Sequence, residues 1–297
     1  DVPDSVCRWD KCLQAGSQKY LLEQLPRGLT SALAPSSTCR PPSGGQRKSQ
    51  AEPLVSFIWT AHNSPLMVAK SLLDVYRTAH EVPSAEFVIF NDGSTDDMTI
   101  LLNVCESLRS VFGADIVNME SATPQGFGKA NNLALNRARG KYAVLLNTDL
   151  YVLPGWISLL LRTLRTYPGA GIVGPMMVTA EGKVMEAGNI LFQTGDAMNW
   201  GRGHWPRQLP FLHARPVDYI SGACIMFDRL SFLRLRLFDP RYEPAYYEDT
   251  DASLTMRRHG LLTVVQPMAV AVHLEGRSYK TANRLLMMED HHKKFKA

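Results

Sequence analysis

Short apolar runs alternate with segments of helical periodicity along residues 53–146. The runs, each typical of a buried β-strand, lie at 54–60, 86–90, 115–118 and 142–146. Between them, apolar residues recur at the spacing of one helix face over 65–76, 100–108 and 127–138. Because strands that alternate with helices usually form a parallel sheet covered by those helices, the pattern predicts an α/β fold with a mainly parallel central sheet.

The run 142–146 is continuous and β-favouring, as expected of a strand buried on both faces, and it ends in a polar turn. Asn147, Thr148 and Asp149 follow it directly. Open α/β sheets bind ligands at the carboxyl ends of their strands. Hard divalent cations take oxygen ligands and need only one or two carboxylates when substrate phosphates supply the rest. Asp149 is therefore a candidate metal ligand with Asn147 beside it, although a simple polar turn uses the same residue types.

The pattern changes beyond Pro168, where strands follow one another with fewer helices between them. The runs typical of strands are 172–178, 183–191, 217–227, 263–266 and 270–273. They predict a smaller mixed or antiparallel region. Residues 248–259 are typical of a helix, with acids in the first turn and Gly260 as the stop. A closing helix ends in a basic tail, where we expect His291 and His292 to be solvated.

Composition limits the class of protein. The 297 residues carry a formal net charge of +4, which is too small to suggest a nucleic-acid partner. No apolar run reaches the length of a membrane span, and the five cysteines have no metal-ligand spacing. Residues 1–52 have linker composition, so we expect a flexible Pro/Ser/Gly-rich tail or stem before one globular domain over 53–297.

Three polar clusters follow predicted strands or begin a predicted helix. They are Asn91–Ser94, Asn147–Asp149 and Glu248–Asp251. Converging acids suit a site that holds a metal, recognises a nucleotide and takes up a proton. The alternatives are a turn acid for Asp92 and a helix cap for Asp249, whose place near a helix start favours the charged carboxylate. His273, after an apolar strand, is either a metal ligand or a hydrogen-bonded histidine at a sheet edge.

Taken together, these residues resemble a family-2-type inverting glycosyltransferase with the GT-A fold, from about Pro53 to Phe295. The segments that carry the resemblance are 54–63, 88–96, 126–134, 145–150, 246–251 and 272–278. The loop 199–203 and the segment 217–223 are similar to surface-polysaccharide transferases of the rhamnosyl- or galactosyl-transferase type. The resemblance divides the domain into a nucleotide-binding half, 53–150, and an acceptor-side half, 151–297.

The resemblance implies sugar transfer from a nucleotide-sugar donor to a hydroxyl of a glycan or glycoconjugate, with inversion. Asp249 would deprotonate the acceptor, with Glu248 the lesser choice, and Asp149 with His273 would bind Mn²⁺ or Mg²⁺. The implied donor residues are Thr60, His62, Asn63, Asp92, Gly126, Lys129, Asn131, Asn147 and Thr148. The implied acceptor residues are Trp200, Arg202, Trp205 and Glu248. The chain departs from the family pattern in Asn147, an amide at the first DxD position, and in Asn91, where many relatives have an acid.

Two other readings remain open. A nucleotidyltransferase would carry a glycine-rich basic loop after the first strand, but that place holds Ala61-His-Asn-Ser-Pro65. A catalytically inactive domain would bind a glycan or partner only. The donor could be a UDP-, dTDP- or GDP-sugar. The stem-like start suits a Golgi-lumen enzyme whose anchor lies outside this chain, and equally a tail on a cytoplasmic enzyme, so membrane association through an N-terminal or missing segment stays open.

Overall fold

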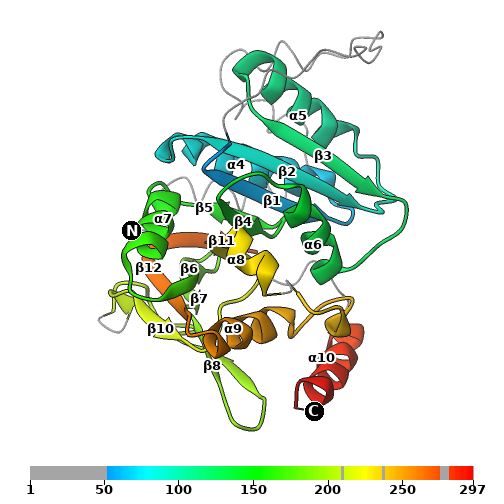
Figure 1. The fold of residues 1–297 in the computed structure, drawn as a ribbon. Coiled ribbons are helices and arrows are strands. Elements are labelled where there is room, and N and C mark those ends of the chain that lie inside the picture. The colour runs from blue at the N-terminus through cyan, green and yellow to red at the C-terminus, as the bar shows by residue number, and fades with distance from the viewer. Residues whose placement is uncertain (1–51, 209–210, 236–237, 275–280, 297) are drawn as a thin grey trace.

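The structure is a computed structural model that describes residues 52–208, 211–235, 238–274 and 281–296. Element labels follow Figure 1. Apart from Glu52, the predicted tail 1–52 lies outside the described residues. No helix in the described ranges is both long and apolar enough to cross a membrane.

The first half of the domain is a parallel sheet with connecting helices. Its elements are β1 (Val55–Ala61), α4 (Pro65–Thr78), η1 (Ala79–Glu81), β2 (Ala85–Asp92), α5 (Thr99–Phe112), β3 (Ile116–Ser121), α6 (Phe127–Arg137) and β4 (Tyr142–Leu146). The strands pair in parallel in the order β4-β1-β2-β3. The alternation read from the sequence is confirmed, with element ends shifted by a few residues.

The second half extends the same sheet with mixed pairing. Its elements are β5 (Leu150–Val152), α7 (Trp156–Thr166), β6 (Ala170–Val178), β7 (Val184–Glu186), β8 (Asn189–Leu191), β9 (Ala197–Asn199), β10 (Arg215–Val217), β11 (Cys224–Asp228), α8 (Arg229–Arg234), η3 (Pro240–Tyr242), α9 (Glu248–Arg258), β12 (Leu262–His273) and α10 (Thr281–Lys296). Antiparallel β11 joins β4 to β6, and β12 continues in parallel beyond β6. The predicted α/β class, with a mainly parallel sheet and a mixed second region, is confirmed.

Several elements differ from the predictions. The run predicted over 183–191 is two short strands, β7 and β8, and the run over 217–227 divides into β10 and β11. The two strands predicted near the end are one strand, β12, with a register shift between Gln266 and Val270. Helix α7 was not predicted, and Gly155, at φ 89°, is the residue from which it starts.

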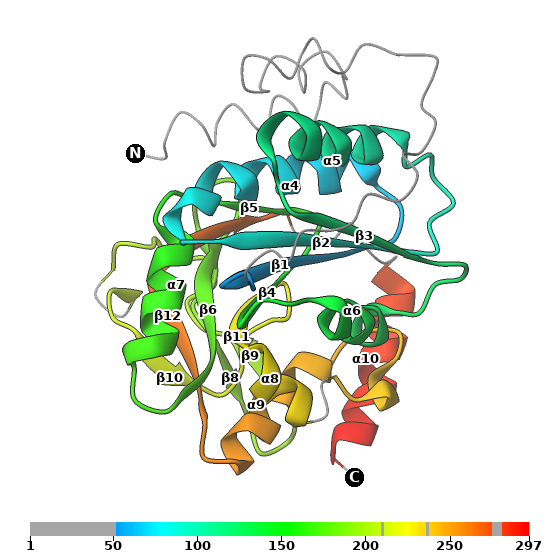
Figure 2. The same cartoon turned by 45° about the horizontal axis from the view of Figure 1, so that its top comes forward.

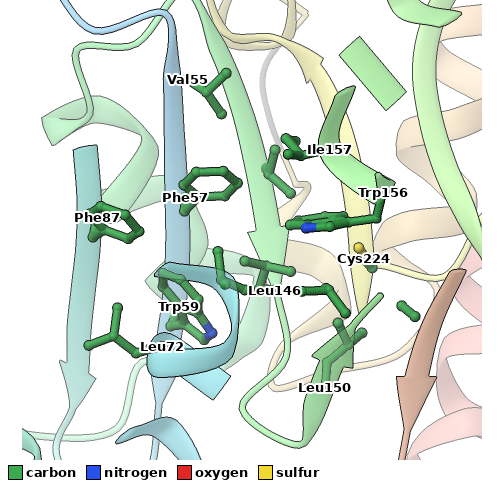
Figure 3. Packing of buried hydrophobic residues seen from close by; sticks show 14 of the residues in the cluster. Val55, Phe57, Trp59, Leu72, Phe87, Leu146, Leu150, Trp156, Ile157 and Cys224 are labelled. Carbon is green, nitrogen blue, oxygen red and sulfur yellow. The ribbon is translucent and has the colours of Figure 1, made fainter. Parts of the chain in front are cut away.

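Helices cover both faces of the sheet (Figure 2). Successive side chains of a strand point to opposite faces, so Phe57 and Trp59 pack with residues of α4, α5 and α7, whereas Ile58 packs with residues of α6, α8 and α9. Figure 3 shows the first of these two cores, where Phe57 lies between Phe87 and Trp156. Burial on both faces explains why β1 and β4 are continuous apolar runs.

A buried chain of hydrogen bonds holds the polar turn after β4 in place. The Trp59 indole N–H donates to Ser71 Oγ at 3.0 Å, and Ser71 Oγ donates to the carbonyl of Leu150 at 2.8 Å. Trp59 and Ser71 are fully buried, so water does not compete for these bonds. The turn Asn147–Asp149 is thereby anchored to α4, next to the carboxyl ends of β1 and β2.

Candidate active site

A cavity of about 950 Å³ lies at the carboxyl ends of β1, β2, β4 and β12, a size typical of small-molecule sites. It brings together all three polar clusters noted in the sequence. The predicted site residues that line it are Thr60, His62, Asn63, Asp92, Gly126, Asn147, Thr148, Arg202, Glu248, Asp249 and His273. Both halves of the domain therefore contribute to one cavity.

Two predicted donor residues on α6 do not line this cavity. Asn131 is buried, and its side-chain N–H₂ donates to Phe127 O at 2.9 Å and to Thr60 Oγ1 at 3.3 Å. Asn131 therefore ties α6 to the end of β1. Lys129 is exposed on the same helix and contributes its backbone N–H, which donates to Glu243 Oε1 at 2.7 Å.

The two tryptophans predicted for the acceptor also lie away from the lining. Trp200 packs against a buried hydrophobic cluster that includes Val184, Phe211 and Val272. The Arg215 guanidinium lies 5.5 Å from the Trp200 ring centre. Trp205 is 51% exposed, with the Lys183 ammonium 4.7 Å from its ring centre. Both rings hold the loop that follows β9, and Arg202 is the residue of this loop that reaches the cavity.

Asp92 shapes one end of the cavity. Its Oδ1 accepts from the Gln125 backbone N–H at 2.7 Å and from Ser121 Oγ at 3.1 Å, and its Oδ2 accepts from the Gly126 N–H at 3.1 Å. The carboxylate thus fixes the loop between β3 and α6. It is largely buried, but it still belongs to the lining.

The turn after β1 is tied to the turn after β2. The His62 ring donates from Nδ1 to the carbonyl of Asp92 at 2.8 Å, since a carbonyl oxygen can only accept. Asn63 Oδ1 accepts from the backbone N–H groups of Thr95 and Asp96 at 2.8 and 3.1 Å. Asn63 has a φ of 62°, a conformation that asparagine tolerates better than most residues. These bonds set one wall of the cavity.

Gly126 opens α6 at a point where no side chain fits. Its φ is +86°, and a Cβ there would overlap the Glu243 carboxylate and the backbone of Pro244. Glu243 in turn caps α6, because its carboxylate accepts a hydrogen bond from the Lys129 backbone N–H in the first turn of the helix. The sequence analysis missed Glu243, because it lies more than a hundred residues from α6 and belongs to no local motif.

Asp149 pairs with His273, which lines the cavity, whereas Asp149 itself is not part of the lining. His273 Nε2 lies 3.2 Å from Asp149 Oδ1, with side chains 13% and 4% exposed. The pairing of β5 with β12 holds them together, since His273 lies opposite Leu150 and the Leu274 N–H donates to Asp149 O at 3.1 Å.

The Asp149–His273 pair fits a divalent cation that shares its coordination with a substrate. The Asp149 oxygen and the His273 nitrogen, 3.2 Å apart, would be near enough to be ligands of one such cation. Among the described residues, no group of three His, Cys, Asp or Glu side chains gathers around one point. The remaining positions would fall to phosphate oxygens and water.

Asp249, the second residue of α9, presents its carboxylate at the other end of the cavity. Its Oδ2 accepts from the Gly222 N–H at 2.9 Å, and its Oδ1 accepts from the Thr250 N–H at 2.7 Å. Burial raises the pKa of Asp249, while these hydrogen bonds oppose the rise. This corrects the expectation that the helix start would govern its charge: burial has the larger effect, and it makes Asp249 more basic.

Glu248 differs from its neighbour. Burial, with the charge of Asp249 as a second cause, raises the pKa of Glu248 well above its usual range. Among the described residues, no group donates a hydrogen bond to its buried Oε2. Two adjacent carboxyl groups with different environments suit different roles. Burial thus favours the protonated form of Glu248 more than in an ordinary glutamate, and Asp249 is the better candidate for a base.

Glu186 is a third acid in this end of the cavity, and the sequence analysis missed it. It ends β7 and is 3% exposed. The Ser221 N–H donates to its Oε1 at 3.3 Å, and the Asn199 side chain donates to its Oε2 at 3.1 Å. The consecutive N–H groups of Ser221 and Gly222 therefore hold Glu186 and Asp249 side by side. A single acid in an apolar run gave no signal in the sequence.

Replacing Glu186 with glutamine is expected to stabilise the metal-free protein at neutral pH. Burial raises the pKa of Glu186 from 4.5 to about 7. Between these values the unfolded chain releases the proton and the folded chain keeps it, so wild-type stability falls as pH rises through this interval. We compare the free energy of unfolding of Glu186→Gln with that of the wild type. The variant's value minus the wild-type value should grow by about 3 kcal/mol as the pH rises from 4.5 to about 7.

Urea unfolding at pH 4.5 and pH 8 measures this difference. Glu120→Gln, at an exposed glutamate of β3, is the matched control, and its difference from the wild type should be the same at both pH values. A pH-independent difference for Glu186→Gln would contradict the raised pKa.

Comparisons with known proteins agree with this arrangement. The sequence model of glycosyl transferase family 2 matches residues 56–235. The O-antigen biosynthesis protein RfbC of Myxococcus xanthus is 27% identical over 232 residues, which are 76% of this chain and 18% of that protein. The chain therefore spans only a small part of this relative.

Two solved structures have a similar fold. GalNAc-T7, solved with UDP, GalNAc and Mn²⁺, matches with a TM-score of 0.63 and 16% identity, covering 84% of this chain and 50% of that one. The mannosyltransferase PcManGT from Pyrobaculum calidifontis, solved with GDP-Man and Mn²⁺, matches with a TM-score of 0.58 and 15% identity, covering 95% of this chain and 71% of that one. With more than half of its residues matched by the family model and with this fold, the chain belongs to glycosyl transferase family 2 and has the GT-A fold.

Proposed function

We propose that the protein transfers a sugar from a nucleotide-sugar donor to a hydroxyl of a glycan or glycoconjugate, with inversion at the anomeric carbon and assistance from Mn²⁺ or Mg²⁺. One observation carries the proposal. A single cavity joins the Asp249 carboxylate to the turns after β1, β2 and β4 and to the Asp149–His273 pair. Carboxylate, imidazole and backbone groups that converge in this way suit a donor diphosphate at one end and an acceptor hydroxyl at the other.

The donor would lie over the turns after β1 and β2. Thr60, His62 and Asn63 form one wall, and Asp92 with Gly126 forms the next. Since three donors already bind its carboxylate, Asp92 acts mainly by holding the Gln125–Gly126 backbone where a base or ribose would rest. Asn147 and Thr148 would face the diphosphate.

Asp149 and His273 would hold the metal ion, which supplies positive charge that stabilises the leaving diphosphate. Their 3.2 Å separation and their burial support this role. Asn147 provides an amide at the first position of the DxD pattern, so the protein supplies few charged ligands of its own. The metal should then bind much more tightly with the nucleotide than without it.

Asp249 would take the proton of the acceptor hydroxyl as that oxygen attacks the anomeric carbon. The new carbon–oxygen bond forms while the bond to the diphosphate breaks on the opposite face, and the nucleoside diphosphate leaves with the bonding electron pair. The raised pKa of Asp249 brings its basicity nearer to what proton uptake requires. Glu248, whose pKa burial raises, and Arg202, from the loop after β9, would contact the acceptor in the same pocket.

The test is nucleotide release from a panel of UDP-, GDP- and dTDP-sugars, with Mn²⁺, with Mg²⁺ and with chelator, using the wild type and Asp249→Asn. We expect metal-dependent release from one donor, lost in the variant. Binding of a donor is followed separately by its effect on the melting temperature, because a ligand that binds the folded state stabilises it.

Each outcome has a distinct meaning. Stabilisation by one donor with no release, even when glycan acceptors are added, would favour a catalytically inactive binding domain. No stabilisation and no release across the panel would contradict the proposed function altogether.

A further inference from the structure

The last turns of α10 pack against the segment that leads into α9 and Asp249. Helix α10, at the lower right of Figure 1, contacts η3. Met288, on α10, lines the cavity together with Tyr246 and Tyr247. Helix α10 lies beyond residues 56–235, the part that the family model matches.

The segment before Asp249 has an unusual backbone. Tyr246 and Tyr247 have φ values of 79° and 75°, so two consecutive bulky residues adopt the left-handed conformation. Such conformations are strained and persist only where the surroundings impose them. The Asp251 N–H donates to Tyr247 O at 2.9 Å, so α9, and with it Asp249, starts directly from this strained pair.

His291 is placed to impose this conformation. Its side chain is 2% exposed, and its Nδ1 lies 3.0 Å from both the Ala245 and the Tyr246 carbonyl oxygens. Because both partners can only accept, Nδ1 carries a proton that the two carbonyls share. The ring also packs edge-on against Tyr242 at 5.8 Å. The expectation that this histidine would be solvated is wrong, because the tail folds back as a helix and buries it.

Neighbouring residues of α10 hold the second tyrosine. The His292 ring stacks on the Tyr247 ring with 6.0 Å between ring centres, and the Phe295 ring packs at a tilt against the same tyrosine with 5.3 Å between ring centres. The Tyr247 hydroxyl donates to Gly195 O at 3.3 Å, which fixes the far end of the ring. The tyrosine pair is thus held by side chains from α10 and by the β8–β9 hairpin.

We propose that His291 is a positioning residue for Asp249. Its Nδ1–H holds the carbonyls of Ala245 and Tyr246, the strained turn follows from that contact, and the turn sets where the Asp249 carboxylate enters the cavity. This inference rests on the proposed function, in which Asp249 is the base. It adds that α10, which lies beyond the part matched by the family model, influences the rate of transfer through this contact.

Three substitutions separate the hydrogen bond from the packing. His291→Ala removes both. His291→Asn keeps an N–H donor close to the place of Nδ1, whereas His291→Gln puts its amide near the place of Nε2 and leaves the two carbonyls without their donor. Lys293→Ala, at an exposed residue of the same helix that pairs with Glu289, is the matched control.

The rate of nucleotide release is measured at saturating donor, using the donor identified by the panel. We expect His291→Ala and His291→Gln to lose roughly 10²-fold in kcat, because a small displacement of a catalytic group has an effect of that size. His291→Asn should recover most of the loss, Lys293→Ala should match the wild type, and the donor KM should change little in any of them. Equal rates for the Asn and Gln variants, or an unchanged rate for Ala, would overturn the proposal.

A second readout does not depend on catalysis. Amide hydrogen exchange over residues 246–252 should quicken in His291→Ala and His291→Gln and return to the wild-type rate in His291→Asn, while exchange in the central sheet stays slow. Should the wild type release no nucleotide, the proposed function fails and this exchange pattern still tests the contact. Exchange at wild-type rates in the Gln variant would show that His291 does not hold the turn. Should the Ala variant fail to fold, the Asn and Gln pair gives the same comparison.

Discussion

Replacement of Asp249 with asparagine is expected to lower kcat about 10³-fold while the affinity for the donor stays unchanged. The amide keeps the size of the side chain but cannot accept the acceptor proton, and general-base catalysis contributes typically 10²–10⁴-fold. The donor end of the cavity is built by other residues, so its binding should survive. Steady-state kinetics of nucleotide release, together with donor binding by calorimetry, measures both quantities.

Asp251→Asn is the control for this variant. Asp251 lies two residues further along α9, is partly buried, and is not part of the cavity lining. Its substitution tests whether loss of an acid from this helix is harmful in general. If Asp249→Asn retained wild-type kcat, or if Asp251→Asn were equally impaired, Asp249 would not be the base.

Replacement of Asp149 with asparagine is expected to lower metal-dependent release on the order of 10²-fold. Loss of a charged ligand removes ~3 kcal/mol of the stabilisation that the cation supplies, and each 1.4 kcal/mol is tenfold in rate. The Mn²⁺ concentration for half-maximal release should rise as well, because the remaining proposed ligand, His273, brings no negative charge to the cation. Release measured over a Mn²⁺ titration gives both changes.

Asp74→Asn is a matched control for Asp149. The Asp74 carboxylate accepts from the Val152 N–H at 2.7 Å, so it supports the same strand, β5, from outside the cavity. This control should keep the wild-type response to Mn²⁺ even if its melting temperature changes. An unchanged Mn²⁺ response in Asp149→Asn would remove Asp149 from the metal site.

Local patterns predicted the parallel half of the fold and the residue types that gather at its edge. Continuous apolar runs marked β1 and β4 because those strands are covered on both faces, and the polar turns after them meet at the carboxyl edge of the sheet. The cavity therefore contains Asp92, Asn147 and Asp249 as predicted neighbours. Such features depend on residues that are close in the sequence, which is why local sequence patterns could predict them.

Features that depend on contacts between distant segments were not predictable. Glu186 and Asp249 are brought together by the consecutive N–H groups of Ser221 and Gly222, which no spacing in the sequence reveals. His291 is buried only because α10 folds back onto the turn before α9. The sign of the pKa change at Asp249 likewise follows from burial, which is a property of the whole fold.

The prediction that Trp200 and Trp205 contact the acceptor failed for the same reason, because the direction of a side chain depends on contacts between distant segments. Trp200 and Trp205 stand in a glycine-rich loop, as sugar-stacking residues often do, but stacking requires a ring that faces the cavity. Arg215 and Lys183 cover these rings instead, and Arg202 is the residue after β9 that, among those described in this loop, lines the cavity. Composition therefore identified the loop and could not tell which of its side chains point inward.

The central claim is a single displacement in which Asp249 activates the attacking oxygen. It is tested most directly by the anomeric configuration of the sugar released when water replaces the acceptor, followed by proton NMR before mutarotation. We predict that the wild type first releases the sugar with the configuration opposite to that of the donor, and that Asp249→Asn releases it far more slowly. Release with the donor's own configuration, or at the same rate from Asp249→Asn, would contradict the proposed mechanism.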